Sequence, residues 1–317
     1  MSETLIEAVK LKKYFSTNAG VVHAVDDVSF KIKAGQTIGV VGESGCGKST
    51  LGRTLLRLYE PTAGKVMYRG QDIAALNKKD FREVQKHMQM IFQDPYSSIN
   101  PHFSVGETIL DPLRVSRMIP DKKEQMARVA ETMELCGLPE RYFNTYPHQL
   151  DGGRRQRVGL ARALALDPDF IVCDEPVSAL DVSIQAQILN LLMDLQQKRN
   201  IAYMFITHDL CVVRHISHDI LVMYMGQVVE YAPREELFKH HVHPYTVGLL
   251  NAIPTIDLNK RNRERHLLNG EVSNPINPAP GCRFANRCPY ASEKCKEPQI
   301  LTEIAPDHFV ACHECVK

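Results

Sequence analysis

A glycine-rich segment near the N-terminus constrains the fold of this chain more than any other feature. The short apolar run Thr37–Val41 leads directly into Gly42-Glu43-Ser44-Gly45-Cys46-Gly47-Lys48-Ser49-Thr50. This segment has the pattern G-x-x-x-x-G-K-[ST], and residues 51–58 after it are expected to form a helix. The spacing therefore predicts an α/β fold in which a phosphate-binding loop joins a buried parallel strand to a helix.

The residue types of this loop suit a nucleoside triphosphate. Glycines let successive backbone N–H groups face inward around the phosphates, and the following helix adds its positive end. We expect Lys48 to reach the β- and γ-phosphates and Ser49 to bind Mg²⁺.

Two further apolar runs end in residues that suit phosphate chemistry. The run Phe170–Cys173 is followed by Asp174 and Glu175. One of these carboxylates can hold Mg²⁺ through water, and the other can polarise the attacking water. The run Ala202–Ile206 leads to His208, and a histidine at the mouth of a nucleotide-binding sheet can sense the γ-phosphate. Between these runs an amphipathic helix is predicted, which Asp181 or Ser183 could start.

The order of these motifs resembles the ATP-binding-cassette (ABC) ATPase family over about residues 5 to 240. The motifs that carry the resemblance are Gly42 to Thr50, Gln93, Leu150 to Arg154, Phe170 to Glu175, Ser178 to Asp181, and His208. The resemblance implies a P-loop NTPase cassette in residues 1–245, a helical subdomain at about 95–165, and a Cys-rich C-terminal extension in residues 246–317.

The same resemblance implies the roles of individual residues. Lys48 would clamp phosphate, Ser49, Gln93 and Asp174 would contact Mg²⁺, Glu175 would be the catalytic base, and His208 would contact the γ-phosphate. Asp181 is expected at the ATP-binding surface. An aromatic near the N-terminus should stack on adenine, and Phe15 is the first candidate, with Tyr14 as the alternative. A core aromatic at this position is a third interpretation.

The resemblance implies a head-to-tail dimer. In such a dimer each ATP is held by the phosphate loop of one subunit and the signature segment of the other. The usual signature is Leu-Ser-Gly-Gly-Gln, whereas this chain has Leu150-Asp151-Gly152-Gly153-Arg154. Asp151 is a good N-cap for the helix over residues 152–163. A carboxylate close to a triphosphate is nevertheless repulsive, by about 4 kcal/mol for two unit charges ~4 Å apart at an effective dielectric of about 20.

Two hypotheses follow from this altered signature. In one, the two changes are paired, so that Arg154 replaces the lost attraction and hydrolysis continues. In the other, the ATP held by the partner subunit is hydrolysed poorly. The altered signature also favours an asymmetric pair with a different ATPase subunit, and a homodimer is the alternative.

Four prolines lie between Gln93 and the signature and predict that this stretch is divided into short helices, the clearest of them over residues 122–135. They are Pro112, Pro120, Pro139 and Pro147. The similar region of ABC proteins receives a short cytoplasmic helix of the membrane subunit. We expect that contact around residues 94–101 and Phe103, the alternative being that Tyr96 and Phe103 are simply packed.

The segment after Phe238 indicates the subfamily. Its three histidines, His240, His241 and His243, favour a local loop over a metal site because Pro244 follows immediately. The run His243-Pro244-Tyr245-Thr246 resembles the ATPase subunits of dipeptide and oligopeptide ABC importers, whose relatives include nickel importers.

Five of the 9 cysteines gather in the C-terminal tail. Four of them, Cys282, Cys288, Cys295 and Cys312, have the spacing C-x5-C-x6-C-x16-C, and Cys315 is a fifth. Four thiolates from irregular loops suit an iron–sulfur cluster or a structural zinc. The subfamily resemblance implies a [4Fe–4S] cluster in some members, while Zn²⁺, reduced thiols or disulfides remain alternatives. Cys46, Cys136, Cys173 and Cys211 are expected to be small apolar packing residues.

Charge composition and apolar run lengths limit which kinds of partner the chain can have. With 38 Lys+Arg and 37 Asp+Glu the net charge is +1, which gives no electrostatic argument for a chain that coats nucleic acid. The longest apolar runs are far short of the ~20 residues that cross a bilayer, and no secretion signal is visible. By resemblance we expect a peripheral ATPase on the cytoplasmic face of the membrane. It would work with two transmembrane permease subunits, a second ATPase subunit and, indirectly, an extracytoplasmic solute-binding protein.

The sequence therefore favours an ATPase that energises import of di- or oligopeptides, with ATP and Mg²⁺ as its ligands. A nickel or other small-solute importer is the alternative. A soluble ABC ATPase of DNA repair or translation is disfavoured because the chain has neither a long coiled-coil insertion nor a second cassette. A redox-sensing module with a vestigial ATPase is disfavoured because Lys48, Asp174, Glu175 and His208 are intact.

Overall fold

The computed structural model describes residues 3–178, 180–252 and 275–316 of the chain. These residues form two compact units. The first unit comprises Lys33–Gln36 and Ala75–Ile206 together with residues 3–5. The second unit comprises Ile6–Ile32, Thr37–Ala74 and the described residues from Thr207 onward. Each unit is described by itself below.

The first unit contains three parallel strands, β6 (Met88–Ile91), β7 (Phe170–Asp174) and β8 (Ala202–Ile206). Met88 pairs with Phe170, and Phe170 pairs with Ala202 on its other side. Every residue of β7 and β8 is buried, which explains why both strands are continuous apolar runs. The run predicted to end at Cys173 continues to Asp174, so that Asp174 is the last residue of the strand.

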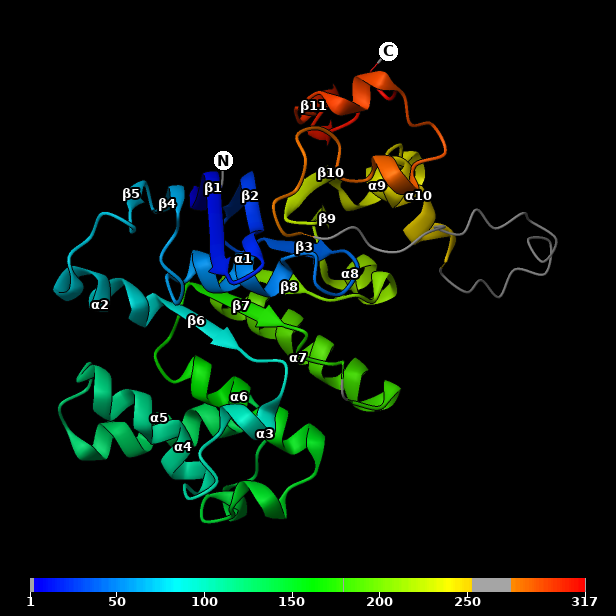
Figure 1. The fold of residues 1–317 in the computed structure, drawn as a ribbon. Coiled ribbons are helices and arrows are strands. Elements are labelled where there is room, and N and C mark those ends of the chain that lie inside the picture. Colours follow the sequence, from blue (N-terminus) through cyan, green and yellow to red (C-terminus); the bar gives the residue numbers. More distant parts are fainter. Residues whose placement is uncertain (1–2, 179, 253–274, 317) are drawn as a thin grey trace. The chain divides into compact units, whose positions relative to one another are not determined.

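Helices account for most of the remaining first unit (Figure 1). They are α2 (Lys78–His87), α3 (Pro95–Ser98), α4 (Val105–Ser116), α5 (Lys122–Leu135), α6 (Gly152–Leu164) and α7 (Val182–Arg199). Short 3-10 helices cover Glu140–Tyr142 and Pro147–Gln149. Residues 95–165 are all described and hold only helices and loops, and α4, α5 and α6 lie together (Figure 1).

The prediction that Pro112 is one of the prolines that divide this stretch into short helices is wrong. Pro112 lies inside α4, which continues to Ser116. A capping box between Ser104 and Glu107 fixes the start of this helix, and Ile109 and Leu113 are buried. An interior proline costs about 3 kcal/mol, whereas each buried Leu or Ile contributes about 1.5–3 kcal/mol. Burial on both sides of the proline therefore outweighs the lost hydrogen bond.

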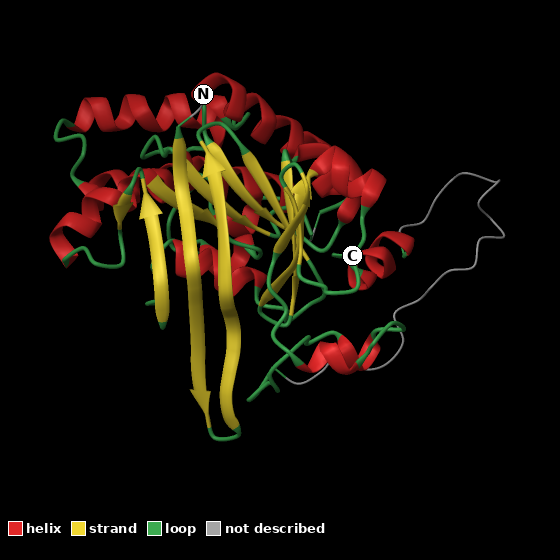
Figure 2. Cartoon of the chain, turned by 90° about the horizontal axis from the view of Figure 1, so that it is seen from above, coloured by secondary structure: helices red, strands yellow, loops and turns green. Residues whose placement is uncertain are grey.

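Apart from the first two residues of β1 and the last residue of β2, the second unit contains a four-stranded antiparallel sheet in the order β2-β1-β4-β5. Its strands are β1 (Thr4–Thr17), β2 (Gly20–Lys33), β4 (Ala63–Tyr68) and β5 (Gln71–Asp72). The two long strands β1 and β2 form the extended hairpin seen in Figure 2. Ile6 pairs with Tyr68 across the sheet.

The same unit contains strands from both ends of the sequence. They are β3 (Thr37–Val41), β9 (Asp219–Tyr224), β10 (Gln227–Pro233), β11 (Thr302–Ala305) and β12 (His308–Val310). The strand β3 is parallel to β9, while β9, β10, β12 and β11 are successively antiparallel. Glu230 of β10 pairs with Val310 of β12. The C-terminal tail is thereby joined to β10, which pairs with β9, the neighbour of the strand β3 that leads into the phosphate loop.

The helices of the second unit are α1 (Lys48–Leu55), α8 (Leu210–Ile216), α9 (Arg234–His240) and α10 (Pro244–Asn251). Short 3-10 helices in the tail cover Ala285–Arg287 and Glu293–Lys296. The helix α1 begins three residues earlier than predicted, because Gly47 takes a left-handed φ of 102° and lets Lys48 be the first helical residue. In the described part of the chain, no helix is both long and apolar enough to cross a bilayer.

An aromatic cluster forms part of the core of the second unit. Tyr224 of β9, Tyr245 of α10 and Phe284 of the tail are each at most 1% exposed. Their rings meet edge-on or tilted, with centroids 4.7 to 5.5 Å apart. Helix α10 and the tail are thus packed against the strand that neighbours β3.

Candidate functional site

The phosphate loop is closed around its lysine. The Nζ of Lys48 donates to the carbonyl oxygens of Gly42 and Glu43, at 2.8 and 2.9 Å, and Lys48 is only 5% exposed. A Cβ on Gly47 would come within 2.0 Å of the carbonyl oxygen of Ala24 on β2, so only glycine fits there. The loop therefore holds a buried ammonium against its own backbone, in the segment whose pattern predicts phosphate binding.

Three groups of Glu43, the second residue of the loop, form hydrogen bonds: its carbonyl, its backbone N–H and its carboxylate. Its carbonyl accepts from Lys48, and its backbone N–H donates to the hydroxyl of Tyr245 at 2.8 Å. Its carboxylate accepts two hydrogen bonds from the guanidinium of Arg287, at 2.7 and 3.0 Å. The hydrogen bonds to Glu43 keep the pKa of Arg287 above its ordinary range, so the guanidinium stays charged. The sequence did not indicate a role at this site for Tyr245 or Arg287.

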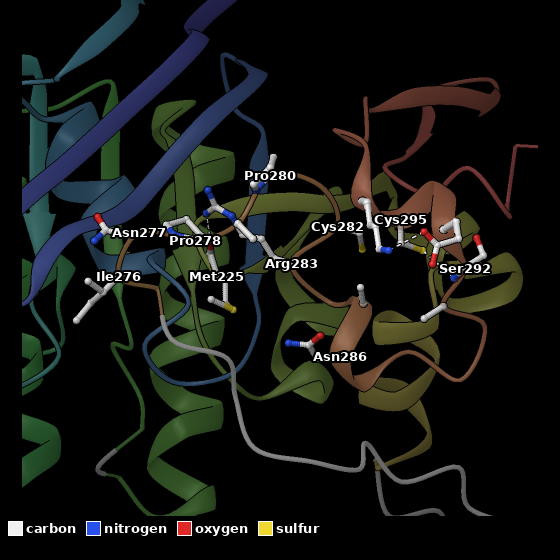
Figure 3. Close-up of a pocket in the computed structure, with 15 residues that line it drawn as sticks. Met225, Ile276, Asn277, Pro278, Pro280, Cys282, Arg283, Asn286, Ser292 and Cys295 are labelled. Carbon is white, nitrogen blue, oxygen red and sulfur yellow. Dashed lines mark hydrogen bonds and ion pairs between the residues drawn. The ribbon is translucent and has the colours of Figure 1, made fainter.

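A second polar cluster centres on Asp26 of β2. The hydroxyl of Tyr14 and the guanidinium of Arg283 both donate to its carboxylate, and Lys12 lies 3.6 Å away. Burial alone would raise the pKa of Asp26, but the hydrogen bond from Tyr14 and the charge of Arg283 outweigh it, so the pKa lies below its usual value. Arg283 also donates to the carbonyl of Met225 (Figure 3).

The two candidate adenine-stacking residues have different surroundings. The ring of Tyr14 stacks on His23 with centroids 4.0 Å apart and an angle of 19° between the planes. The ring of Phe15 meets Tyr59 edge-on at 5.4 Å and has the Lys13 ammonium 4.9 Å from its centroid. Tyr14 therefore has both its ring and its hydroxyl engaged by residues of its own unit.

In the first unit, the structure brings Gln93 and Glu175 together. The amide nitrogen of Gln93 donates to a carboxylate oxygen of Glu175 at 2.8 Å. Glu175 directly follows β7, and its backbone N–H donates to the carbonyl of Ile206 at 2.9 Å. Its φ is +46°, a left-handed value that is uncommon for a residue with a Cβ. Asp174, one residue earlier, is 1% exposed.

The signature segment forms the start of α6. Asp151 caps this helix, and its carboxylate accepts from the backbone N–H of Arg154 at 2.7 Å. The guanidinium of Arg154 also forms an ion pair with the Asp151 carboxylate and lies over the ring of Tyr142. The two residues that depart from the usual signature are thus bonded to each other.

The remaining predicted nucleotide-site residues occupy the ends of strands and helices. Asp181, one of the two residues predicted to start this helix, caps α7. Hydrogen bonds from the Ser183 hydroxyl and the Ile184 N–H lower the pKa of Asp181. His208 is exposed and follows Thr207, whose backbone N–H donates to the carbonyl of Val40 at 3.2 Å. Lys48 and His208 thus belong to the second unit, whereas Asp181 belongs to the first.

The histidines before α10 have structural roles where the contacts are defined. His243 is 1% exposed, and its Nδ1 caps α10 by accepting from the backbone N–H of Tyr245. The backbone N–H of His243 donates to the buried carboxylate of Glu230. Burial lowers the pKa of His243 to about 4. The same Glu230 carboxylate lies 2.9 Å from His308 of the tail.

The cysteines of the tail are neighbours but are not arranged around a metal. The N–H of Cys282 donates to the carbonyl of Cys295 at 2.8 Å, and both line a cavity of about 780 Å³ (Figure 3). Burial raises the pKa of Cys282 to about 11, and the neighbouring Cys295, Cys312 and Cys288 add to the shift. Among the residues that the structure describes, no three or more metal-ligating side chains are arranged to hold an ion. The four thiols therefore do not fit an iron–sulfur cluster or zinc in this conformation.

The other cysteine predictions are partly confirmed. All nine cysteines have free thiols, so the disulfide alternative is not seen. Cys46, Cys136 and Cys173 are buried packing residues, as predicted. Cys211 is exposed, because it lies on the outer side of the short helix α8, and the packing interpretation is wrong there.

Comparisons with known proteins agree with this geometry. The family model described as ABC transporter matches residues 25–178, and the model for the oligopeptide/dipeptide transporter C-terminal region matches residues 229–295. The oligopeptide transport ATP-binding protein AppF of Bacillus subtilis is 48% identical, with 98% of this chain and 97% of AppF covered. The putative oligopeptide transport ATP-binding protein YkfD of the same organism is 49% identical, with 98% of this chain and 95% of YkfD covered.

Solved structures give the same fold. The ATP-binding cassette MJ0796, in a dimeric post-hydrolysis state bound to ADP and Pi, has a TM-score of 0.66 and 28% identity. The comparison covers 73% of this chain and 99% of that one. The predicted fold class, an α/β P-loop cassette, is confirmed.

Proposed function

Because this chain belongs to the family of ATP-binding proteins of oligopeptide and dipeptide ABC transporters, we propose that it energises the import of di- or oligopeptides by hydrolysing ATP. The chain is an ABC ATPase that converts ATP and water to ADP and phosphate. The proposed cargo comes from the names of the relatives and from the match of residues 229–295 to the peptide-transporter C-terminal region.

The observation that carries the catalytic assignment is the hydrogen bond between Gln93 and Glu175. A carboxylate that an amide holds in place can accept a proton from a water within hydrogen-bond reach, which is the role of a general base. Lys48 would bind the β- and γ-phosphates, and His208 the γ-phosphate. Mg²⁺, held by Ser49, Gln93 and Asp174, would neutralise charge that develops on the phosphates.

The proposed partners follow from this function. Two permease subunits would span the membrane, and a second ATPase subunit, the same chain or a different one, would supply the opposing signature segment. On the first unit, Tyr96 is 61% exposed with the Arg155 guanidinium 3.6 Å from its ring centroid, and Phe103 is half-buried. These residues around α3 are our candidates for the permease contact. The chain would then lie peripherally on the cytoplasmic face of the membrane.

A transport assay tests the proposal. The full chain is reconstituted in proteoliposomes with its permease subunits and solute-binding protein, and ATP-dependent uptake of labelled di- and oligopeptides is compared with uptake of Ni²⁺. Peptide uptake that is lost in Lys48→Ala supports the proposal. Uptake of Ni²⁺ without uptake of peptides would refute the peptide cargo and identify the chain as the ATPase of a nickel importer.

The C-terminal cysteines require a separate test. The [4Fe–4S] cluster that the sequence predicts on Cys282, Cys288, Cys295 and Cys312 does not fit the thiols as they lie, since these neighbouring side chains are not arranged to hold an ion. We propose it only for a rearranged tail that brings the four thiols together. Anaerobic purification followed by iron, zinc and acid-labile sulfide analysis decides the matter. About four iron and four sulfide per chain support the cluster, zinc alone identifies a structural zinc site, and no metal refutes both.

A further inference from the structure

The contact between Arg287 and Glu43 joins the C-terminal tail to the phosphate loop. The two residues are 244 positions apart in the sequence, and both belong to the second unit. The Arg287 side chain is 5% exposed and the Glu43 side chain 26% exposed. The two parallel N–H···O bonds between them fix the orientation of the carboxylate as well as neutralising it.

The surroundings hold the guanidinium of Arg287 in one place. It lies 5.8 Å from the ring centroid of Tyr224 and 5.9 Å from that of Phe284. Tyr224, Phe284 and Tyr245 form the buried aromatic cluster of this unit. The hydroxyl of Tyr245 accepts the N–H of the same Glu43. Through Glu43, the phosphate loop therefore contacts both Tyr245 of the aromatic cluster and the guanidinium of Arg287.

The chemistry of the loop shows why this cation matters. Glu43 is an acidic residue inside a loop whose ligand is a triphosphate, so its carboxylate alone would repel that ligand. Lys48, the loop's own cation, is bonded to the carbonyls of Gly42 and Glu43 rather than to the Glu43 carboxylate. The neutralising charge comes instead from the tail.

We propose that Arg287 is a positioning residue of the ATP site, which neutralises and orients Glu43 so that the phosphate loop accepts the triphosphate. ATP affinity then depends on the C-terminal extension, although the extension contributes no residue of the phosphate-loop motif. This inference rests on the proposed binding of ATP at Lys48. The competing interpretation is that the ion pair only fastens the tail to the rest of the unit.

Equilibrium binding of ATP, ADP and AMP to the full chain distinguishes the two. In Arg287→Ala, the Glu43 carboxylate is left without its partner, and we expect ATP to bind about tenfold more weakly. The loss should decrease from ATP to ADP to AMP, because each has less negative charge than the one before. Adding Glu43→Gln to Arg287→Ala removes the uncompensated charge, and we expect this double variant to bind ATP within about threefold of the unmodified chain.

The double variant separates positioning from fastening. Both Arg287→Ala and the double variant lack the ion pair, so thermal unfolding should show a similar loss of stability in both. Recovery of ATP affinity without recovery of stability is the expected result. If the double variant binds ATP as weakly as Arg287→Ala, or if Arg287→Ala binds it normally, the ion pair is only a fastening and the inference is overturned.

Two controls complete the design. Arg199→Ala breaks an ion pair of the first unit, with Glu131 and Asp167, and should leave ATP binding unchanged. Lys48→Ala should weaken binding strongly whatever the role of Arg287. If Lys48→Ala binds ATP normally, the assignment of the loop as the ATP site fails, which is a different outcome from failure of the Arg287 proposal alone.

Discussion

The amide of Gln93 holds the carboxylate of Glu175 through a hydrogen bond of 2.8 Å. Gln93 follows β6 and Glu175 follows β7, two strands that pair directly in parallel. The carboxyl ends of paired parallel strands meet at one edge of the sheet, so the topology itself places these side chains together. The left-handed φ of Glu175 adds a local constraint on where its carboxylate lies.

Glu175→Gln should separate binding from hydrolysis. The substitution keeps the size of the side chain but removes its ability to accept a proton from water. We expect ATP affinity to change little and the hydrolysis rate to fall by roughly 10²–10⁴-fold. Steady-state phosphate release and equilibrium ATP binding measure the two effects. Glu131→Gln, which changes an ion-paired glutamate on α5, is the matched control, and hydrolysis by Glu175→Gln at the normal rate would refute Glu175 as the base.

The pairing of Asp151 with Arg154 makes a prediction about the altered signature. Because the guanidinium already neutralises the carboxylate, we expect Asp151→Ser to change single-turnover hydrolysis by less than a few-fold. Arg154→Gln leaves the Asp151 charge uncompensated and, if the proposed dimer places Asp151 near the partner subunit's ATP, should lower the rate. A large gain in rate with Asp151→Ser would instead show that the aspartate suppresses hydrolysis.

Stability measurements on the same helix provide a control for the signature variants. Asp151 caps α6, and loss of an N-cap costs about 1 kcal/mol of unfolding free energy. Asp151→Ala should show this loss in chemical denaturation, whereas Asp151→Ser, which keeps a capping oxygen, should not. Equal losses in both variants would mean that the ion pair, rather than the cap, stabilises the helix start.

The contacts of Phe15 and Tyr14 predict which of them stacks on adenine. Tyr14 is engaged by His23 and Asp26 within the unit, so we expect Phe15 to bind the base. Stacking of a base on an aromatic ring is worth about 1–3 kcal/mol, so Phe15→Ala should weaken ATP binding at least fivefold. Phe15→Tyr should preserve it, as should Tyr14→Phe. A loss confined to Tyr14→Ala would exchange the two assignments.

Burial of His243 predicts how stability depends on pH. Its pKa is about 4 in the folded chain and near 6.5 in an unfolded one, so the unfolded state takes up a proton first as the pH falls. Stability is therefore fully present above about pH 6.5 and decreases towards pH 4, by an amount on the order of 3 kcal/mol.

The contribution of His243 can be isolated by substitution. Asn can still cap α10 but does not titrate, so His243→Asn should flatten the pH dependence measured by denaturant unfolding between pH 7.5 and 5. His308 and Glu230 adjoin the same site and are present in both proteins, so the comparison isolates the contribution of residue 243. An unchanged slope in His243→Asn would contradict the prediction.

The sequence was most informative where local pattern and structure coincide. The strands Thr37–Val41 and Ala202–Ile206 and the helix Lys122–Leu135 have the predicted bounds. These elements are set by continuous apolar runs or by a capped helical period, which a reader can see within a few residues. Pro112 was misjudged because the burial of α4, which outweighs the proline, is a property of the tertiary structure.

The contacts of Glu43 show why part of the site was missed. Neither Arg287 nor Tyr245 has a pattern that identifies a partner some 200 or more residues away. The run that contains Tyr245 indicated the subfamily, but nothing in its spacing indicated that its hydroxyl faces the phosphate loop. Pairings of this kind depend on the register of β9, β10 and β12, which no local signal determines.

The distance in sequence between Glu43 and Arg287 also has a consequence for synthesis of the chain. At about 5–20 residues per second, a ribosome takes roughly 12–50 s to add the 244 residues that separate them. During that interval the emerging N-terminal part contains its lysine and glycines but lacks the arginine that neutralises its glutamate. If Arg287 positions Glu43 as proposed, a nascent or C-terminally shortened chain would therefore bind ATP more weakly than the full chain. The phosphate loop would reach its full affinity for ATP only when the tail is in place.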